Sequence, residues 1–176
     1  MSETAREHRE GAPKKLRFGI YICSTSRYEQ LKRRRKVDDV SGNLIEALLE
    51  KAGQTVSFRT IISDDPDLIE NGVRHVLDSA DVDAAILCGG TGITHSDVTI
   101  ETVTPFLEKV LPGFGEIFRR ISYDEMGSSA VMSRATAGVA KGKIFFCIPG
   151  SPNAVKLCLE KLIIPEAGHI LRHARE

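Results

Sequence analysis

The sequence predicts an α/β domain in which a mostly parallel β-sheet is covered by helices on both sides. Strand-like and helix-like segments alternate along the chain with short connections, as they do in folds built from strand–helix–strand units. The strand-like segments are also apolar at consecutive positions, which is typical of strands that are buried on both faces.

Four segments have the composition of buried strands. Each is rich in β-branched, aromatic or small apolar residues, and each is followed by residues that favour turns. The predicted strands cover residues 16–23, 55–62, 84–88 and 143–148.

The segments between these strands carry helical signals. Apolar residues at positions 44, 45, 48 and 49 cover one face of a helix that ends before Gly53. Pro66 suits the first turn of the next helix, and Asp65 is its expected N-cap. The helical pattern over 97–121 is broken at Pro105 and at Pro112, so we expect two or three short helices there.

The carboxyl-terminal part closes with two further predicted helices, over about 153–161 and 165–172. Residues 123–142 have no clear periodicity, and they receive no assignment.

The composition describes one ordinary domain. The chain has 176 residues, with 24 lysines and arginines against 24 aspartates and glutamates, and 41% of its residues are hydrophobic. A chain of this length can form a core without disulfides or metals. Its apolar runs are far shorter than the ~20 residues that span a bilayer. We therefore expect a cytoplasmic protein that makes no membrane contact, with a disordered tail over 1–13 and a single domain over 14–176.

The four cysteines, at positions 23, 88, 147 and 158, lack the spacing of a zinc or redox motif. Three of them end predicted strands, so they could meet in a shared thiolate site. Buried free thiols that act as small apolar side chains are the simpler interpretation. A reducing compartment is the matching inference.

Small or hydroxylated loops follow all four predicted strands. In an open parallel sheet the carboxyl ends of the strands meet at one edge, where ligands of such folds bind. The composition of these loops suits a polyanion together with a metal ion. The loops are Ser24-Thr25-Ser26, Ser63-Asp64-Asp65, Gly89-Gly90-Thr91-Gly92 and Pro149-Gly150-Ser151-Pro152.

The glycine loop, residues 89–92, is a candidate phosphate-binding loop. Glycines directly after a strand let backbone N–H groups approach phosphate oxygens that a Cβ would keep away. A tight turn that needs positive φ is an equal alternative, because the loop matches neither the Walker A nor the dinucleotide-binding motif.

Two aspartates lie on the same predicted edge, Asp97 after the glycine loop and Asp64 after the second strand. Mg²⁺ is usually held by one or two carboxylates plus substrate phosphates, so this pair is chemically sufficient for a magnesium site. An aspartate at the start of a helix is more often only an N-cap, and this remains the alternative for Asp97.

The basic run from Lys32 to Lys36 has two interpretations. The neutral overall charge and the following Asp38 and Asp39 argue against nucleic-acid binding. The run is then either a solvated loop or a set of cations that contact substrate phosphates. His95, near the glycine loop, fits an exposed loop residue.

Taken together, the separated motifs of this chain resemble the MogA/MoaB family of molybdenum cofactor biosynthesis. The resemblance runs from Leu16 to about Ile170, and the early segments around Ser26 to Glu29 and Asp39 to Gly42 resemble the MoaB branch. The motifs that carry it are Gly89 to Gly92, Asp97-Val98-Thr99 with Glu101, Pro112 to Glu116, Ser133-Arg134, Gly138 and Pro149 to Pro152.

The resemblance implies a three-layer α/β/α fold and a Mg²⁺-dependent reaction. In that reaction the terminal phosphate of molybdopterin attacks the α-phosphorus of ATP, and pyrophosphate leaves. By position the two catalytic, metal-binding aspartates of the family fall on Asp97 and Asp64. The expected substrate-binding residues are Gly89, Gly90, Thr91, Gly92, Ser133, Arg134, Gly150 and Ser151.

The resemblance also implies a trimer or a dimer of trimers and a downstream metal-insertion protein, which inserts molybdenum or tungsten. We expect exposed apolar side chains, at Phe106, Leu107, Phe114 and Phe118, to drive this assembly.

One departure from the family pattern is Ser96, where the family often has Arg. Arg27, Arg134 or the basic run could supply the missing phosphate contact. A catalytically silent molybdopterin-binding or scaffolding protein of the same fold is the alternative function.

Overall fold

The computed structural model describes residues 11–176, and it contains a six-stranded sheet with the strand order β2-β1-β3-β6-β5-β4. The first four strands in this order are parallel, and β5 and β4 continue the sheet through antiparallel pairs. The strands are β1 (Arg17–Cys23), β2 (Thr55–Ile62), β3 (Ala84–Cys88), β4 (Lys109–Val110), β5 (Thr136–Ala140) and β6 (Lys143–Ile148). The prediction of a mostly parallel sheet is confirmed.

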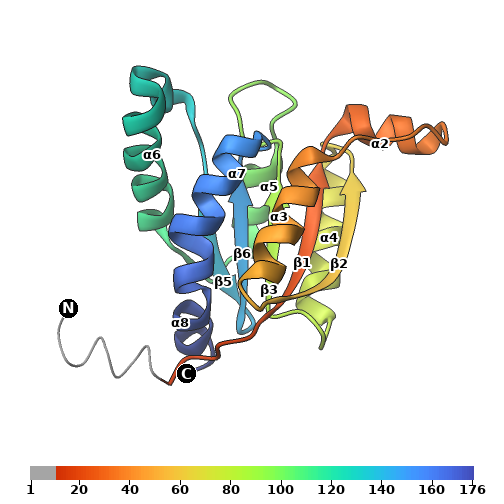
Figure 1. Cartoon of the computed structure of the whole chain (residues 1–176). Coiled ribbons are helices and arrows are strands. Elements are labelled where there is room, and N and C mark those ends of the chain that lie inside the picture. The colour runs from red at the N-terminus through yellow and green to blue at the C-terminus, as the bar shows by residue number, and fades with distance from the viewer. Residues whose placement is uncertain (1–10) are drawn as a thin grey trace.

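Helices cover both faces of this sheet (Figure 1). The helical segments are α2 (Thr25–Lys32), α3 (Val40–Lys51), α4 (Pro66–Asp78), α5 (Thr99–Val103), η1 (Thr104–Phe106), α6 (Pro112–Met126), η2 (Gly127–Met132), α7 (Pro152–Cys158), η3 (Leu159–Ile163) and α8 (Ile164–Arg175). Helices α3, α6, α7 and α8 contribute to one core cluster, and α4 and α5 contribute to the other. The three-layer α/β/α architecture is therefore confirmed.

The central strands explain the two cores, because successive side chains of a strand point to opposite faces. In β6, Ile144, Phe146 and Ile148 join the core under α3, α6, α7 and α8, whereas Phe145 and Cys147 join the core under α4 and α5. All four cysteines are buried free thiols, as the apolar interpretation predicted. Burial raises the pKa of Cys23 to about 12, so this thiol stays protonated and unreactive at neutral pH.

Three features differ from or add to the predicted elements. The region left unassigned holds η2 and β5, and β5 joins β6 through a tight turn in which Lys141 and Gly142 both have positive φ. The polar segment before the basic run forms α2, which buries none of its residues. The two predicted carboxyl-terminal helices are joined by the π-helical turn η3, which ends two residues before Pro165. This turn accommodates a proline, which cannot donate a backbone hydrogen bond.

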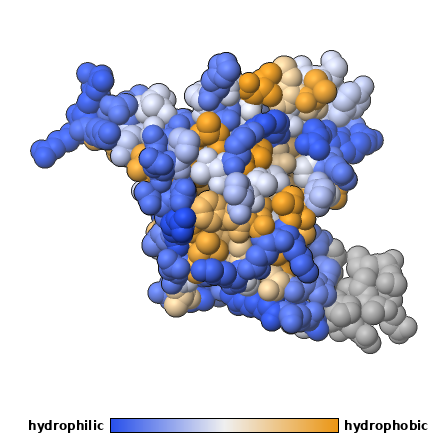
Figure 2. Space-filling model, turned by 180° about the vertical axis from the view of Figure 1, so that it is seen from behind, coloured by the Kyte–Doolittle hydropathy of each residue, from blue (hydrophilic) through white to orange (hydrophobic). Residues whose placement is uncertain are grey.

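The expectation about exposed apolar residues is wrong for the four residues chosen. Phe114 and Phe118 are buried in the core, and Phe106 and Leu107 are partly buried against α4 and α5. Figure 2 shows that apolar side chains gather instead along the upper edge and in the middle of the face seen from behind. The large apolar residues that are exposed on α6 and η2 are Ile117, Tyr123, Met126, Val131 and Met132.

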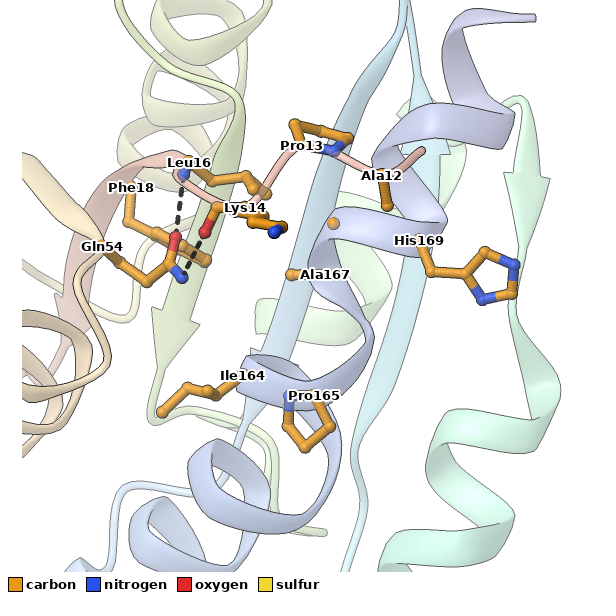
Figure 3. Close-up of a pocket in the computed structure, with 11 residues that line it drawn as sticks. Ala12, Pro13, Lys14, Leu16, Phe18, Gln54, Ile164, Pro165, Ala167 and His169 are labelled. Carbon is orange, nitrogen blue, oxygen red and sulfur yellow. Dashed lines mark hydrogen bonds between the residues drawn. The ribbon is translucent and has the colours of Figure 1, made fainter. Parts of the chain in front are cut away.

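Among residues 11–176, no helix combines the length and the apolar character needed to cross a bilayer. Most of the expected tail, residues 1–10, lies outside the described residues. Ala12 and Pro13 lie along α8, where they line a pocket of about 230 Å³ with the first residues of β1 (Figure 3). The side chain of Gln54, between α3 and β2, holds the residues that precede β1, because it accepts from Leu16 N at 2.8 Å and donates to Lys14 O at 3.1 Å.

An ion-pair cluster joins β1, β3 and α8 at the amino ends of the parallel strands. The Asp83 carboxylate, 8% exposed, accepts hydrogen bonds from Arg17 Nε at 3.0 Å and from Arg175 Nη2 at 2.8 Å. Burial alone would raise the pKa of Asp83, but the hydrogen bonds from Arg17 and Arg175 outweigh it and lower the pKa to about 2. This carboxylate is therefore ionised at every physiological pH.

We expect Asp83→Asn to lower the free energy of unfolding by about 2 kcal/mol at pH 7, because charge-assisted hydrogen bonds are lost. The pKa of Asp83 in the folded state lies below the unfolded value of about 3.9. Its contribution is therefore present above about pH 4 and is lost as the pH falls towards 2. Urea unfolding of both proteins between pH 7 and pH 3 measures this difference.

Asp81→Asn is the matched control, because Asp81 also pairs with Arg17 but its side chain is 87% exposed. An exposed pair contributes about 0 to 1 kcal/mol. Equal effects of the two substitutions would contradict the assigned role of Asp83.

Candidate functional site

The glycine loop forms a tight turn at the carboxyl end of β3. Gly89 and Gly90 have φ values of +110° and +61°, in the region that favours glycine. A Cβ at Gly89 would lie 2.2 Å from the carbonyl oxygen of Cys23, at the end of β1. Gly89 N donates to the carbonyl of Ile148 at 2.9 Å, so the loop is held against the end of β6 as well. The loop is therefore a tight turn that needs positive φ, which is the second of its two interpretations.

Asp64 borders this loop at Gly90. Its Oδ2 accepts hydrogen bonds from the backbone N–H of Thr25 at 2.8 Å and from Thr25 Oγ1 at 3.0 Å. Thr25 Oγ1 also accepts from Asp64 N at 3.1 Å. Asp64 Oδ1 lies only 2.8 Å from the position that a Cβ at Gly90 would take. The start of α2 thus holds one carboxylate oxygen of Asp64 and leaves the other directed at the glycine loop.

Asp97 borders the same loop at Gly92, whose added Cβ would lie 2.7 Å from Asp97 Oδ2. This oxygen accepts from Thr94 Oγ1 at 2.6 Å and from Thr94 N at 2.8 Å. The Thr94 hydroxyl is the main cause of a lowered pKa of Asp97, and the backbone N–H groups of Thr94 and Gly92 and the charge of Arg134 act in the same direction. Asp97 is therefore a stable anion at neutral pH.

A pocket of about 300 Å³ opens over the glycine loop, at the edge where the carboxyl ends of the parallel strands meet. Of the ten predicted substrate-binding and catalytic residues, eight line this pocket; the other two are Asp64 and Ser151. Its lining consists of Gly89, Gly90, Thr91, Gly92, Asp97, Met132, Ser133, Arg134, Pro149 and Gly150. The predicted residue Ser151 lines a neighbouring pocket, where its hydroxyl caps α7 by accepting from Ala154 N at 3.3 Å.

Arg134 supplies the positive charge of this pocket. Its Nε donates to the carbonyl of Thr91 at 2.9 Å, and its Nη2 lies 2.7 Å from Glu101 Oε1. The guanidinium is thereby held in the lining of the pocket that also contains Asp97. Of the residues expected to compensate for Ser96, Arg134 is the one that lines this pocket. Arg27 donates instead to the carbonyl of Asp38.

The donor set fits Mg²⁺. Asp64 and Asp97 border one loop on either side of Thr91, each with one oxygen held by a threonine. No cluster of three or more metal-binding side chains occurs within residues 11–176. Mg²⁺ typically takes one or two carboxylates and fills its other positions with water and substrate phosphates, so Asp64 and Asp97 are a sufficient set of protein donors.

The residues that orient the two carboxylates were not predicted from the sequence. Thr25 is the first residue of α2, 39 residues before Asp64, and Thr94 belongs to the loop before Asp97. Thr99, fully buried, donates to the carbonyl of Gly89 at 2.9 Å and so fixes the turn. Ser41 donates to the carbonyl of Gly150 at 2.7 Å and holds the last loop in place. The available signal was that hydroxyl residues cluster after the strands.

The basic run, His95 and Asp65 do not line the pocket. The basic run follows α2, which projects from the domain at the upper right of Figure 1, and all of its residues are exposed. Lys32 pairs with Glu29 at 3.6 Å and lies over the ring of Tyr28. These contacts agree with the solvated interpretation. His95 is exposed as expected, and Asp65 caps α4 by accepting from Leu68 N at 3.1 Å.

Comparison with known proteins agrees with the fold and shows the family. A family model described as a probable molybdopterin binding domain matches residues 19–169. The chain is 43% identical to molybdenum cofactor biosynthesis protein B of Bacillus subtilis (strain 168), over 98% of both chains. It is 41% identical to a molybdopterin adenylyltransferase of Pyrococcus furiosus, over 97% of this chain and 98% of the relative.

A solved structure is similar over almost the whole domain. The crystal structure of a molybdenum cofactor biosynthesis protein B has a TM-score of 0.85 and 44% sequence identity, with 93% of this chain and 98% of that chain covered.

Proposed function

Because the chain belongs to the family of molybdopterin-binding domains that includes MoaB and MogA, we propose that it is a molybdopterin adenylyltransferase of molybdenum cofactor biosynthesis. A single observation carries the proposal from the family to this site. The two carboxylates and the cationic Arg134 border one glycine loop, over which a pocket opens.

The proposed reaction is a transfer of AMP. A terminal phosphate oxygen of molybdopterin forms a bond to the α-phosphorus of ATP, and the bond from that phosphorus to the oxygen that bridges to the β-phosphate breaks. The products are adenylylated molybdopterin and pyrophosphate. Transfers of this class depend on positioning and on neutralising charge more than on covalent catalysis.

The residues of the pocket can meet both needs. Because the N–H groups of Gly89 and Gly92 already donate to Ile148 and Asp97, those of Gly90 and Thr91 are the proposed donors to phosphate oxygens, and Arg134 balances the charge that develops on them. Asp97 and Asp64 are the proposed ligands of Mg²⁺, which would neutralise phosphate charge when bound. The threonine hydrogen bonds to each aspartate keep its second oxygen in a fixed direction. Ser133 and Gly150 complete the wall on which the pterin or its phosphate would lie.

The proposed partners follow from the family. We propose a cytoplasmic protein that assembles as a trimer or a dimer of trimers and that passes its product to a metal-insertion protein. The exposed apolar residues of α6 and η2 support assembly, since Met126, Val131 and Met132 are 51%, 82% and 54% exposed. Met132 also lines the pocket, so that this apolar surface adjoins the site.

We expect Asp97→Asn to lower turnover by about two orders of magnitude or more. The substitution removes the negative charge while asparagine keeps most of the shape, and each 1.36 kcal/mol of lost stabilisation is a factor of ten in rate. Pyrophosphate release at saturating ATP, Mg²⁺ and molybdopterin measures the effect. Molybdopterin binding should survive, because most of the proposed pterin contacts lie elsewhere in the pocket.

Asp65→Asn is the control, because Asp65 neighbours Asp64 but only caps α4. Asparagine caps a helix about as well as aspartate, so activity should stay within about tenfold of the wild type. Wild-type turnover in Asp97→Asn would refute the role of Asp97. A wild-type protein that binds molybdopterin but releases no pyrophosphate would favour the silent binding protein.

The proposed assembly has its own test. Light scattering at micromolar concentration should give the mass of three or six chains of 19.3 kDa. Replacing Val131 by Asp should shift that mass towards the monomer if η2 lies in the interface, because an apolar contact becomes charged. A wild-type monomer at this concentration would contradict the proposal.

A further inference from the structure

Glu101 contacts the one arginine that lines the pocket over the glycine loop. The Nη2 atom of Arg134 lies 2.7 Å from Glu101 Oε1, and its Nε donates to the carbonyl of Thr91 at 2.9 Å. The first contact ties the guanidinium to α5, and the second ties it to the glycine loop. Glu101 itself does not line the pocket, and it is not among the predicted site residues.

The helix that carries Glu101 is attached to the same glycine loop. Thr99, the first residue of α5, is fully buried and donates from Oγ1 to the carbonyl of Gly89 and from its backbone N to the carbonyl of Gly90, both at 2.9 Å. The contacts therefore form a closed ring, from the loop through Thr99 to Glu101, on to Arg134 and back to the loop. Such a ring fixes the guanidinium relative to the loop more firmly than either contact alone.

The Nη2 atom of Arg134 depends on Glu101. This atom is buried, although the whole side chain is 34% exposed, and it makes no hydrogen bond within residues 11–176. Ion pairs between exposed groups contribute little, but a buried charge that loses its partner is strongly unfavourable. Without the charge of Glu101, the guanidinium would therefore leave its position instead of keeping Nη2 buried and unpaired.

The two contacts leave one nitrogen of Arg134 for a ligand. Within residues 11–176, the hydrogen bond and the ion pair of Arg134 use Nε and Nη2, so the N–H groups of Nη1 are available. Because the guanidinium is a rigid planar fork, fixing two of its nitrogens also fixes the direction of the third. A phosphate group is the anion that such a fork binds well.

Glu101 has two opposite effects on an anion in this pocket. Its negative charge repels the anion, whereas its contact with Arg134 holds a cation in place for the anion. If the charge dominated, an uncharged residue at position 101 would strengthen phosphate binding. The buried Nη2 favours the second effect, because a released guanidinium would find another carboxylate, Asp97, in the lining of the same pocket.

We propose that Glu101 is a positioning residue, which holds Arg134 so that Nη1 binds a phosphate group of the nucleotide. The identity of the phosphate ligand rests on the proposed function, in which ATP is a substrate and pyrophosphate a product. Binding of pyrophosphate can be measured without turnover, so the two proposals can fail separately.

The test is a calorimetric titration of the full chain with inorganic pyrophosphate in the presence of Mg²⁺. Glu101→Gln keeps most of the shape and removes the charge, and it should weaken pyrophosphate binding about tenfold, because a charge-assisted contact to phosphate is lost. A simple effect of charge would have the opposite sign. The direction of the change therefore separates positioning from electrostatic repulsion.

A double-mutant cycle tests whether Glu101 acts through Arg134. Arg134→Gln should weaken pyrophosphate binding by about tenfold or more. Adding Glu101→Gln to Arg134→Gln should then change the affinity by less than about twofold, because the residue that Glu101 positions is gone. Additive effects of the two substitutions would contradict the proposal.

Glu70→Gln is the matched control, because Glu70 also pairs with an arginine, Arg74, at 2.6 Å but does not line the pocket. It should leave the pyrophosphate affinity unchanged. The Glu101 side chain is 53% exposed, so its substitution leaves the core intact, and thermal unfolding of each variant verifies this.

Unchanged or tighter binding of pyrophosphate by Glu101→Gln would overturn the proposal, and so would a wild-type protein that does not bind pyrophosphate. A wild type that shows the expected binding effects but releases no pyrophosphate from ATP and molybdopterin would contradict the proposed function and support the role of Glu101.

Discussion

The site depends on the absence of side chains at three positions of one loop. At Gly89 a Cβ would collide with the carbonyl of Cys23, at Gly90 with Thr99 and Asp64, and at Gly92 with Asp97. Both carboxylates can therefore approach the turn closely, and the turn can approach the ends of β1 and β6. The positive φ values of Gly89 and Gly90 add a second reason for glycine. The loop in which the fold requires glycine is therefore the same loop that we propose to contact phosphates.

The buried strands of the sheet hold the glycine loop and its neighbouring loops in place. The strands β1, β3 and β6 are buried on both faces, so the loops that follow them start from a rigid edge. Threonine and serine hydroxyls then connect the loops to one another: Thr25 to Asp64, Thr99 to Gly89 and Ser41 to Gly150. The amino edge of the sheet has a different chemistry. There Arg17 and Arg175 pair with Asp83.

The features that could be predicted from sequence are those with a strong local pattern. Strands β1, β3 and β6 are mostly apolar runs, and β2 is rich in β-branched and aromatic residues. Asp64 and Asp97 belong to the polar loops that follow β2 and β3. Strand β5 escaped prediction because its small residues resemble a loop; Gly138 there lies against Leu107, where a Cβ would be 2.6 Å from its Cδ1. Helix α2 was not predicted because it buries no residue and so has no apolar face. The contact of Thr25 with Asp64 spans 39 residues, and no local pattern announces such a contact.

The most direct test of the central claim is the turnover of Gly90→Ala, measured as pyrophosphate release from ATP in the presence of molybdopterin. A methyl group there would lie 2.4 Å from Thr99 Oγ1 and 2.8 Å from Asp64 Oδ1, so Asp64 or the turn must move. We expect turnover to fall by about a hundredfold or more. Gly113→Ala, where a Cβ meets nothing within 4 Å, should stay close to the wild type. Wild-type turnover in a folded Gly90→Ala protein would contradict the account.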